Sequence, residues 1–376
     1  MLVEKVTIIG VGLLGGSLAA SLKRTGCAGE ITGVDTPEVL AKALEMGIID
    51  KTYQSPEEGV RGADMVVLAT PISAILTLIP RLASHFKPGA LVTDVGSTKV
   101  EIIKTAQKYL PETVCFIGGH PMTGSERSGV TSADSFLFEN AVYVLTPLQT
   151  HHQQIPAPES LSEPSLPEFT ILCKIVKKIG GRVLVLDPVS HDEIVAAVSH
   201  LPYLLSVSLV NLIADLQAKH PDLLQLAAGG FRDLTRVASG SPKMWVDICQ
   251  SNKSQILPLL DLLIQNLQTL KNLISEESVL SKLERARQVR NTIPYSNKGL
   301  LEPLHEIRLV AKDEPGVLAT LTRVIAEAGI NISDMEILKI REGEGGTIRL
   351  AFRLRSDALQ AVELLKHAGF NARLQD

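Results

Sequence analysis

The sequence predicts three domains of different class: an α/β domain with a mostly parallel sheet over residues 1–188, an all-α domain over 189–292, and a small α+β domain over 303–376. Short apolar strands alternate with amphipathic stretches in the first part, and helical periodicity without strands fills the second. The third part follows the order β-α-β-β-α-β. At 376 residues the chain is longer than one hydrophobic core usually supports, which agrees with several domains.

The first domain is predicted from continuous runs of valine, isoleucine and leucine. Such runs are typical of parallel strands that are covered by helices on both faces. The proline-rich stretch 151–168 interrupts the alternation and is interpreted as a surface loop. The expected strands are "VTIIG" (6–10), "ITGVD" (31–35), "MVVLA" (65–69), "LVTDV" (91–95), "TVCFIG" (113–118), "AVYVLT" (141–146) and "RVLVL" (182–186).

The second and third domains are predicted from helical spacing and from element order. In "IVAAVSHLPYLLSVSLVNLIADL" and "ILPLLDLLIQNLQTLKNLI", apolar residues recur three, four and seven positions apart around much of each helix. We therefore expect this domain to bury apolar surface against a second copy, as a helical dimerisation domain. Residues 291–303 have the composition of a linker, and the segment after them is expected to form a ferredoxin-like split βαβ module.

Bulk composition excludes several classes of partner. The net charge is −4, which favours neither a nucleic acid nor a membrane surface. We expect no signal segment and no apolar run approaching about 18 residues. The four cysteines are far apart and form no CxxC pair, so we expect reduced thiols in a cytoplasmic protein rather than disulfides or a metal site; they are Cys27, Cys115, Cys173 and Cys249.

A glycine-rich turn after the first strand predicts a dinucleotide site. Gly10, Gly12 and Gly15 have GxGxxG spacing, between an expected strand and an expected helix that opens with Leu13 and Leu14. This pattern allows a tight turn, close approach of a pyrophosphate, and close packing of helix on strand, as in Rossmann-like domains. A helix N-terminus that binds no ligand is the alternative, but it does not explain the glycine pattern.

The end of the second strand indicates which nicotinamide cofactor is bound. Asp35 lies 20 residues after Gly15, where a carboxylate hydrogen-bonds the adenosine ribose. The same carboxylate would repel a 2′-phosphate, and neither Thr36 nor Pro37 offers a cation, so NAD is favoured over NADP. Thr70, in "ATP" (69–71) after the third strand, is expected to line the same site.

Two further strand ends predict a reactive site at the carboxyl edge of the sheet. "TDVGSTK" (93–99) ends the fourth strand, and "GGHPMTGSE" (118–126) follows the fifth as a turn. Ser97 and His120 are therefore expected to lie beside the nicotinamide, where a neutral histidine can act as a base. A role for Ser97 as the N-cap of a helix that begins near Lys99 is an alternative.

These motifs together resemble the prephenate dehydrogenase family. "GVGLLGGS", "DVGSTK", "GGHPMTGSE", "SHLPY" and "GGFRDLTRVASGSPKMW" occur in the family's order over residues 1 to about 290. Members are NAD-dependent enzymes of tyrosine biosynthesis, which convert prephenate to 4-hydroxyphenylpyruvate and CO2. Arogenate dehydrogenase, whose substrate carries an amine in place of the keto group, is the nearest alternative. A β-hydroxyacid or imine-reducing dehydrogenase and an NAD- or amino-acid-responsive binding protein are more distant ones.

The resemblance implies a role for each matching residue. His120 matches the histidine that takes the proton of the ring hydroxyl, and Ser97 matches the serine that orients it. Arg236 matches an arginine that binds a substrate carboxylate. Glu126 and Asp233 match two acids at the pocket mouth. Trp245 matches an aromatic that reaches the pocket from the partner subunit, and Tyr203 stands where some members have histidine. No metal is implied.

The C-terminal module resembles an ACT domain, through "DEPGVL" (313–318) and "GINI" (329–332). Asp313 and Gly316 stand at the turn into its first helix, where backbone N–H groups can hold a carboxylate. Asn331 is a candidate to complete an amino-acid site or, equally, a structural turn residue. Tyrosine, the end product of the pathway, is the expected effector, with binding of tyrosine in the active site as the alternative.

Five other polar residues near these motifs carry plainer interpretations. His191 and His200 are expected to be core histidines with satisfied hydrogen bonds. Asp192 and Glu193 are expected to be charges in the first turn of a helix. Arg232 is either a surface charge or a second contact for a carboxylate.

Overall fold

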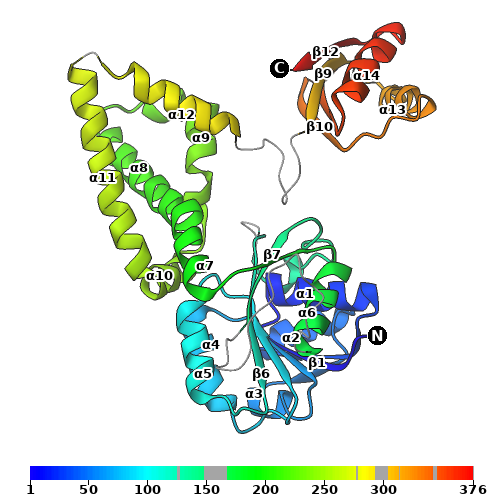
Figure 1. Ribbon diagram of the computed structural model, residues 1–376, viewed down its shortest axis with the longest axis vertical. Helices are drawn as coiled ribbons and strands as arrows, with labels where there is room; N and C mark the ends of the chain where they lie inside the picture. Colours follow the sequence, from blue (N-terminus) through cyan, green and yellow to red (C-terminus); the bar gives the residue numbers. More distant parts are fainter. Residues whose placement is uncertain are drawn as a thin grey trace. The chain divides into compact units, whose positions relative to one another are not determined.

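The computed structural model describes residues 1–124, 128–147, 167–276, 278–292, 304–312, 314–341 and 345–375. The chain divides into two compact units, Met1–Ala286 and Arg287–Asp376. Figure 1 shows an α/β part and a helical part in the first unit and a small α/β module in the second. The predicted fold class, a Rossmann-like domain followed by a helical domain and an ACT-type module, is confirmed.

An eight-stranded sheet forms the centre of the first unit, in the order β3-β2-β1-β4-β5-β6-β7-β8. Its first six strands in this order are parallel, while β7 runs antiparallel to β6 and parallel to β8. The short edge strand β3 was not expected from the sequence. The strands are β1 (Val3–Ile9), β2 (Ala28–Val34), β3 (Lys51–Tyr53), β4 (Met65–Leu68), β5 (Leu91–Asp94), β6 (Cys115–Pro121), β7 (Val142–Pro147) and β8 (Arg182–Val185).

Helices cover both faces of this sheet, as continuous apolar strands require. On one face lie α1 (Leu13–Thr25), α2 (Pro37–Glu45), the short turn η1 (Val130–Ser132) and α6 (Pro167–Lys178). On the other lie α3 (Pro56–Gly59), α4 (Ile72–Leu82) and α5 (Val100–Tyr109). The buried side chains of each face form a separate hydrophobic cluster, and the second cluster also includes Ile248 from the helical region.

The helical region begins with one long helix that contains a π-helical turn. The helix consists of α7 (Pro188–Val195), the π turn η2 (Ala196–His200) and α8 (Leu201–Gln217). Pro202 follows the turn and has no N–H to donate, which accounts for the local change in hydrogen bonding. The elements after it are η3 (Leu223–Leu226), α9 (Gly229–Thr235), η4 (Arg236–Ser239), α10 (Pro242–Ser251), α11 (Lys253–Ser275) and α12 (Leu280–Thr292).

This long helix is more apolar than the sequence analysis allowed for. Among the described residues, Pro188–Gln217 is the one helix long and apolar enough to cross a membrane, with a mean hydropathy of 1.6 over an 18-residue window. Only 28% of that window is buried. The expectation that no apolar run approaches 18 residues was therefore wrong for this helix, and its exposed apolar face needs a partner.

The second unit is a four-stranded antiparallel sheet packed against two helices, with strand order β10-β11-β9-β12. It has its own core of buried apolar side chains from both layers. The element order β-α-β-β-α-β agrees with the expected module. The elements are β9 (His305–Ala311), α13 (Val317–Glu327), β10 (Asp334–Arg341), β11 (Gly345–Phe352), α14 (Arg355–His367) and β12 (Asn371–Gln375).

Candidate active site

The glycine turn between β1 and α1 leaves room for a ligand at one position only. Gly10 has a φ of +91°, and a Cβ there would lie 2.5 Å from the Ala69 carbonyl oxygen. A Cβ at Gly15 would lie 1.9 Å from the Gly10 oxygen, so this glycine is required for packing. A Cβ at Gly12 would meet nothing within 4 Å. The first and third glycines therefore shape the turn, and the second faces open space where a pyrophosphate can approach.

Polar groups beside this turn fit a bound dinucleotide. The carboxylate of Asp35 accepts hydrogen bonds from the backbone N–H groups of Val11 and Thr36, both at 2.7 Å. Helix α1 begins without a side-chain cap at Gly12, so its first N–H groups are not satisfied by a side chain. Leu13 and Leu14 open this helix and are half-buried. The hydroxyl of Thr70 is buried and has no hydrogen-bond partner among the described residues, as expected for a group that binds a ligand.

A buried ion pair joins the ends of β5 and β6. Lys99 Nζ donates to Asp94 and, at 2.7 Å, to the carbonyl oxygen of Gly119. Both charged side chains are fully buried. Asp94 also accepts from the backbone N–H groups of Gly96 (2.7 Å) and Gly119 (3.2 Å). Burial lowers the pKa of Lys99, and the Asp94 carboxylate opposes this shift. The pair fixes the residue before His120 against the loop that carries Ser97.

The two glycines before His120 are required by the close packing around this ion pair. A Cβ at Gly118 would lie 2.3 Å from the Thr146 hydroxyl and 3.2 Å from Cδ of Lys99. A Cβ at Gly119 would lie 2.5 Å from the Asp94 carbonyl oxygen. Strand β6 continues through these glycines to Pro121, so His120 lies within the strand rather than in the turn expected after residue 118.

His120 is joined to two residues of the helical region. Its Nδ1 lies 2.8 Å from Nε2 of His191, and Nδ1 of His191 lies 2.7 Å from Oδ1 of Asp192. His191 and Asp192 are buried, whereas His120 is half-buried. Burial lowers the pKa of His120 well below its ordinary value of 6.5, and positive charge on His191, Lys99 or His200 would act in the same direction. His120 is therefore a neutral base at neutral pH.

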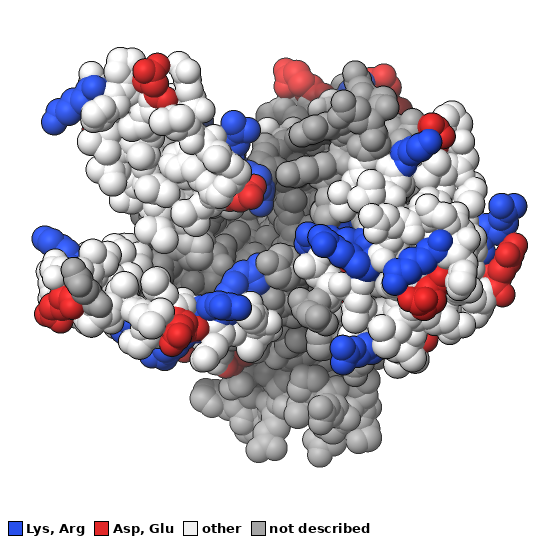
Figure 2. Space-filling model, turned by 90° about the horizontal axis from the view of Figure 1, so that it is seen from above, with Lys and Arg blue, Asp and Glu red and all other residues white. Residues whose placement is uncertain are grey.

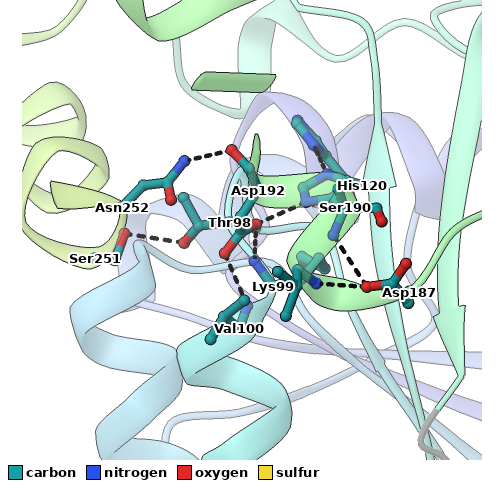
Figure 3. A network of polar contacts seen from close by, with 12 residues as sticks. Thr98, Lys99, Val100, His120, Asp187, Ser190, Asp192, Ser251 and Asn252 are labelled. Carbon is teal, nitrogen blue, oxygen red and sulfur yellow. Dashed lines mark hydrogen bonds and ion pairs between the residues drawn. The ribbon is translucent and has the colours of Figure 1, made fainter. Parts of the chain in front are cut away.

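Neither Glu193 nor Asp192 lies in the first turn of α7, where both charges were expected, and Asp192 is buried. Its carboxylate accepts from the backbone N–H groups of Lys99 (2.7 Å) and Val100 (2.9 Å), the first residues of α5 (Figure 3). A carboxylate from the helical region thus caps a helix of the sheet domain, in the place where Ser97 was considered. Ser97 itself is half-buried in the loop after β5, at the same edge of the sheet as His120. Glu193 is exposed.

Asn252 connects the start of α11 to the same group. Its Nδ2 donates to the Asp192 carbonyl oxygen at 2.8 Å and lies 3.2 Å from Nδ1 of His200. Burial lowers the pKa of His200 to about 4, so this histidine is neutral. We call this group the sheet-edge network; it consists of Asp94, Lys99, His120, His191, Asp192, His200 and Asn252. Sequence analysis identified only His120 of these as a functional residue, because the contacts join segments far apart in the chain.

Two aromatic side chains expected near the substrate pack against each other. Tyr203 and Trp245 are stacked, with ring centroids 3.5 Å apart and an interplanar angle of 6°. His200 meets the Trp245 ring edge-on at 5.9 Å. Tyr203 is buried. Trp245 is therefore in contact with residues of its own chain, and it extends the sheet-edge network with an apolar wall.

The remaining candidates are exposed or lie outside the described residues. Asp233 on α9 and Arg236 at the start of η4 are exposed, and η4 packs against α8. Arg232 is also exposed. Glu126 and Asp313 lie outside the described residues. In the second unit Gly316 has a φ of +92° and precedes α13, and Asn331 is exposed.

Comparisons with known proteins identify three family models along the chain. The nucleotide-binding domain of prephenate dehydrogenase matches residues 18–164, its dimerization domain matches 187–285, and the ACT domain matches 305–366. Prephenate dehydrogenase of Bacillus subtilis (strain 168) is 33% identical over 368 residues, which is 96% of each chain.

Two solved structures show the same fold over the first unit. Prephenate dehydrogenase from A. aeolicus, in complex with hydroxyphenyl propionate and NAD+, superposes with a TM-score of 0.67 at 32% identity and covers 77% of this chain and 96% of its own. Synechocystis arogenate dehydrogenase superposes with a TM-score of 0.61 at 33% identity and covers 76% of this chain and 97% of its own.

Proposed function

The chain belongs to the prephenate dehydrogenase family and is an NAD-dependent oxidoreductase, and we propose that it oxidises and decarboxylates prephenate with His120 as the base. The observation that carries the choice of base is the position of His120. It lies at the carboxyl edge of the sheet, neutral at pH 7, with Nδ1 engaged by His191. Its Nε2 is the ring nitrogen that remains for the substrate hydroxyl.

The reaction needs little beyond orientation and one proton acceptor. NAD, when bound, would supply the acceptor for the hydride of the ring carbon that carries the hydroxyl. The ring carboxylate leaves as CO2, and its bonding electrons complete the aromatic ring. The proton that His120 takes from the hydroxyl returns to the phenolic oxygen of the product, so the base ends neutral. Aromatisation supplies the driving force, and the enzyme supplies alignment and proton transfer.

The cofactor is held by the turn after β1. We assign Gly10, Gly12 and Gly15 to the pyrophosphate site, and Asp35, which accepts from the N–H of Val11 beside this turn, to the adenosine ribose. The unsatisfied Thr70 hydroxyl and the uncapped first turn of α1, which begins with Leu13 and Leu14, offer further donors. A carboxylate at Asp35 favours NAD over NADP, because it would repel a 2′-phosphate.

We assign the binding site for a substrate carboxylate and the dimer interface to the helical region. We assign Arg236 to a carboxylate of prephenate, because a guanidinium binds carboxylates with two parallel hydrogen bonds. Glu126 and Asp233 are assigned to the mouth of the same pocket, Ser97 to the ring hydroxyl, and Tyr203 and Trp245 to its apolar wall. A homodimer would cover the exposed apolar face of the long helix. Four free cysteines agree with a reducing, cytoplasmic location.

A kinetic comparison tests this function directly. NADH formation at about 340 nm is measured with prephenate and with arogenate, for the wild type and for His120→Asn. We expect prephenate to be preferred and the variant to lose about 10²-fold or more in kcat, the range for removal of a general base, with KM little changed. Preference for arogenate, or near wild-type kcat in the variant, would contradict the proposal.

The pH dependence of the wild type gives a second test of the base. A histidine with a lowered pKa stays neutral as the pH falls through the ordinary value of 6.5. The kcat should therefore be unchanged from neutral pH to below 6.5, and should fall only at more acidic pH, where His120 becomes protonated. A fall of kcat centred on an ordinary histidine pKa would exclude this environment for the base.

We also propose that the ACT module binds tyrosine and inhibits the enzyme. Helix α13 begins at Val317 without a side-chain cap, directly after Gly316 in the left-handed conformation. Its first N–H groups are suited to a carboxylate, with Asp313 and Asn331 as further contacts. Tyrosine binding at the active site is the competing route, because tyrosine resembles the product.

Deletion of residues 303–376 separates the two routes for tyrosine. If the module is the sensor, the shortened enzyme should keep its kcat and lose inhibition by tyrosine. In the full chain, Gly316→Ala should weaken inhibition, because alanine is strained at a φ of +92°. Gly329→Ala is the matched control, because it carries similar strain (φ +71°) at the other end of α13. Full inhibition of the shortened enzyme would place tyrosine in the active site.

A further inference from the structure

The carboxylate of Asp192 receives three donors, and this determines the protonation of its neighbour. Two of the donors are the backbone N–H groups of Lys99 (2.7 Å) and Val100 (2.9 Å), which cannot act as acceptors. Two such bonds at a helix N-terminus stabilise the negative charge of a carboxylate. An ionised carboxylate has no proton to give, so His191 must donate from Nδ1 across the 2.7 Å contact to Oδ1.

The next contact follows from the first. A neutral imidazole with its proton on Nδ1 presents a lone pair at Nε2. With His191 neutral, its Nε2, which lies 2.8 Å from His120 Nδ1, is the acceptor, so His120 is the donor in this pair and carries its own proton on Nδ1. The Nε2 of His120 is then left with a lone pair. This is the nitrogen that must be unprotonated if the ring is to accept a proton from the substrate.

His200 shows that the same surroundings do not impose this tautomer on every histidine. Asn252 Nδ2 donates to the carbonyl oxygen of Asp192, which identifies that atom as the amide nitrogen. The same Nδ2 lies 3.2 Å from Nδ1 of His200, so His200 accepts at Nδ1 and carries its proton on Nε2. Two neutral histidines of one network thus hold opposite tautomers, each set by its own partner.

We infer that His191 and Asp192 are positioning residues, which hold the proton of His120 on Nδ1 and so keep its Nε2 available as the base. The inference rests on the proposed role of His120. When Nε2 takes the substrate proton, the imidazolium still donates from Nδ1 to His191, whose opposite nitrogen is bonded to Asp192. The positive charge is thereby stabilised without a second proton transfer.

The local structure keeps this chain of contacts rigid. Asp187 caps α7 by accepting from the N–H groups of Val189 and Ser190, both at 3.0 Å, and Pro188 begins the helix (Figure 3). Asp192 is bonded to the start of α5, so α7 cannot rotate without loss of that cap as well. The contacts of Asp192 with α5 therefore fix the orientation of His191, whereas the Asp187 side chain contributes to the stability of α7.

Three substitutions and one control test the inference by steady-state kinetics with prephenate. His191→Leu removes the acceptor for His120 and should lower kcat by about 10²-fold, with KM little changed, because misplacing the proton removes most of the benefit of a general base. His191→Gln offers an amide oxygen in its place and should retain kcat within about tenfold of the wild type. Asp192→Asn should fall near the leucine variant, since an amide cannot accept from all three donors.

The control is Asp187→Ala, which removes a side chain that caps α7 through Val189 and Ser190 and keeps the backbone bond to the N–H of His191. It should lower the melting temperature by about 2–4 °C and leave kcat unchanged. The inference is overturned if His191→Leu, when folded, keeps kcat within about threefold of the wild type. It is also overturned if the glutamine and leucine variants are equally slow, or if Asp187→Ala slows the reaction to the same extent.

A spectroscopic measurement needs neither a variant nor a substrate. In protein labelled with ¹⁵N-histidine, long-range proton–nitrogen spectra distinguish protonated from unprotonated ring nitrogens. At neutral pH, His120 should be protonated on Nδ1 and His200 on Nε2. A proton on Nε2 of His120 would refute the inference even if prephenate proves to be the substrate. If the enzyme does not oxidise prephenate, the proposed function fails while this measurement still decides the tautomer.

Discussion

The helical region has two parts with different surfaces. We call α7 and the junction of α10 and α11 its base, and α8, the rest of α11 and α12 its outer part. At the base, α7 contributes the buried side chains of His191 and Asp192, which hydrogen-bond to the sheet domain, and the hydroxyl of Ser251 at the end of α10 lies 2.9 Å from that of Thr98. Farther out, α8 has two buried residues, α11 has one and α12 has none. Large apolar side chains are instead exposed there; they include Val210, Leu212, Leu216, Leu257, Leu262, Ile264, Leu267, Ile274, Leu280 and Leu283.

This difference indicates what one chain completes alone and what it leaves to a second copy. The base carries its own hydrogen-bond partners, so the environment of the proposed catalytic histidine is formed within one chain. The outer part leaves apolar area in contact with water, which a folded monomer normally avoids. On the left of Figure 2, where the helical region lies, wide areas carry neither sign of charge. We expect this surface to form the dimer interface.

The largest predicted effect concerns the buried ion pair at the base. Lys99→Met keeps the length of the side chain but leaves the Asp94 carboxylate buried with only backbone donors. The free energy of unfolding should fall by about 3–5 kcal/mol, as for other buried pairs from which one partner is removed. Chemical denaturation of the dehydrogenase unit, followed by fluorescence of Trp245, measures this change.

A half-exposed ion pair of the same domain provides the control. Lys87 pairs with Asp64, and the two side chains are 37% and 33% exposed. Lys87→Met should therefore lower the free energy of unfolding by no more than about 1 kcal/mol. If the two variants were equally stable, the buried charges at the base of the helical region would contribute no more to stability than a half-exposed pair. The difference between the two surfaces would then have no measurable effect on the free energy of unfolding.

The sequence predicted the parts of this arrangement that depend on local pattern. Continuous apolar runs predicted the strands, and the spacing of Gly10, Gly12 and Gly15 predicted the turn after β1. The three-residue strand β3 was missed, because it has a partly exposed edge position and no apolar run. His191 was correctly expected to be a buried, hydrogen-bonded histidine, but its partner His120, 71 residues away, was not predicted. Asp192 was wrongly expected in a first helical turn, because its contacts to α5 span 92–93 residues. A local sequence pattern does not predict which residues of two domains contact each other.

The second predicted effect concerns the apolar outer part. Leu257, Ile264, Leu267 and Ile274 of α11 recur at spacings of seven, three and seven residues, so they share one side of the helix. Ile264 is 62% exposed. Ile264→Glu should weaken dimerisation by about tenfold or more, because a carboxylate would have to be buried without a partner. Sedimentation velocity over a range of concentrations measures the change.

The control for this variant is an exposed leucine of the sheet domain. Leu44 on α2 is 44% exposed, and Leu44→Glu should leave the dimer intact. An unchanged dimer in Ile264→Glu would mean that another surface mediates association, and that the apolar outer part is covered in some other way.

The smallest predicted effect concerns a polar contact at the margin of the base. Asp247 on α10 accepts from the backbone N–H (3.0 Å) and the hydroxyl (2.7 Å) of Ser73, in the first turn of α4. Like Asp192, it is a carboxylate of the helical region that caps a helix of the sheet domain. Asp192 also bonds to a histidine, whereas the hydrogen bonds described for Asp247 involve only Ser73. We therefore expect Asp247 to affect stability and not catalysis.

Asp247→Ala should lower the free energy of unfolding by about 1 kcal/mol, the usual value for a lost helix cap, and leave kcat unchanged. Both donors bond to the same oxygen, so Asp247→Asn can keep both bonds with its amide oxygen and should lose less stability than the alanine variant. The loss that remains in the asparagine variant measures the interaction of the charge with the helix dipole. Denaturation and kcat are measured on the same preparations. A fall in kcat comparable to that expected for Asp192→Asn would mean that any loosening of the two domains slows the reaction. In that case the effect of Asp192 could not be attributed to the tautomer of His120 from kinetics alone, and the nitrogen spectra would decide it.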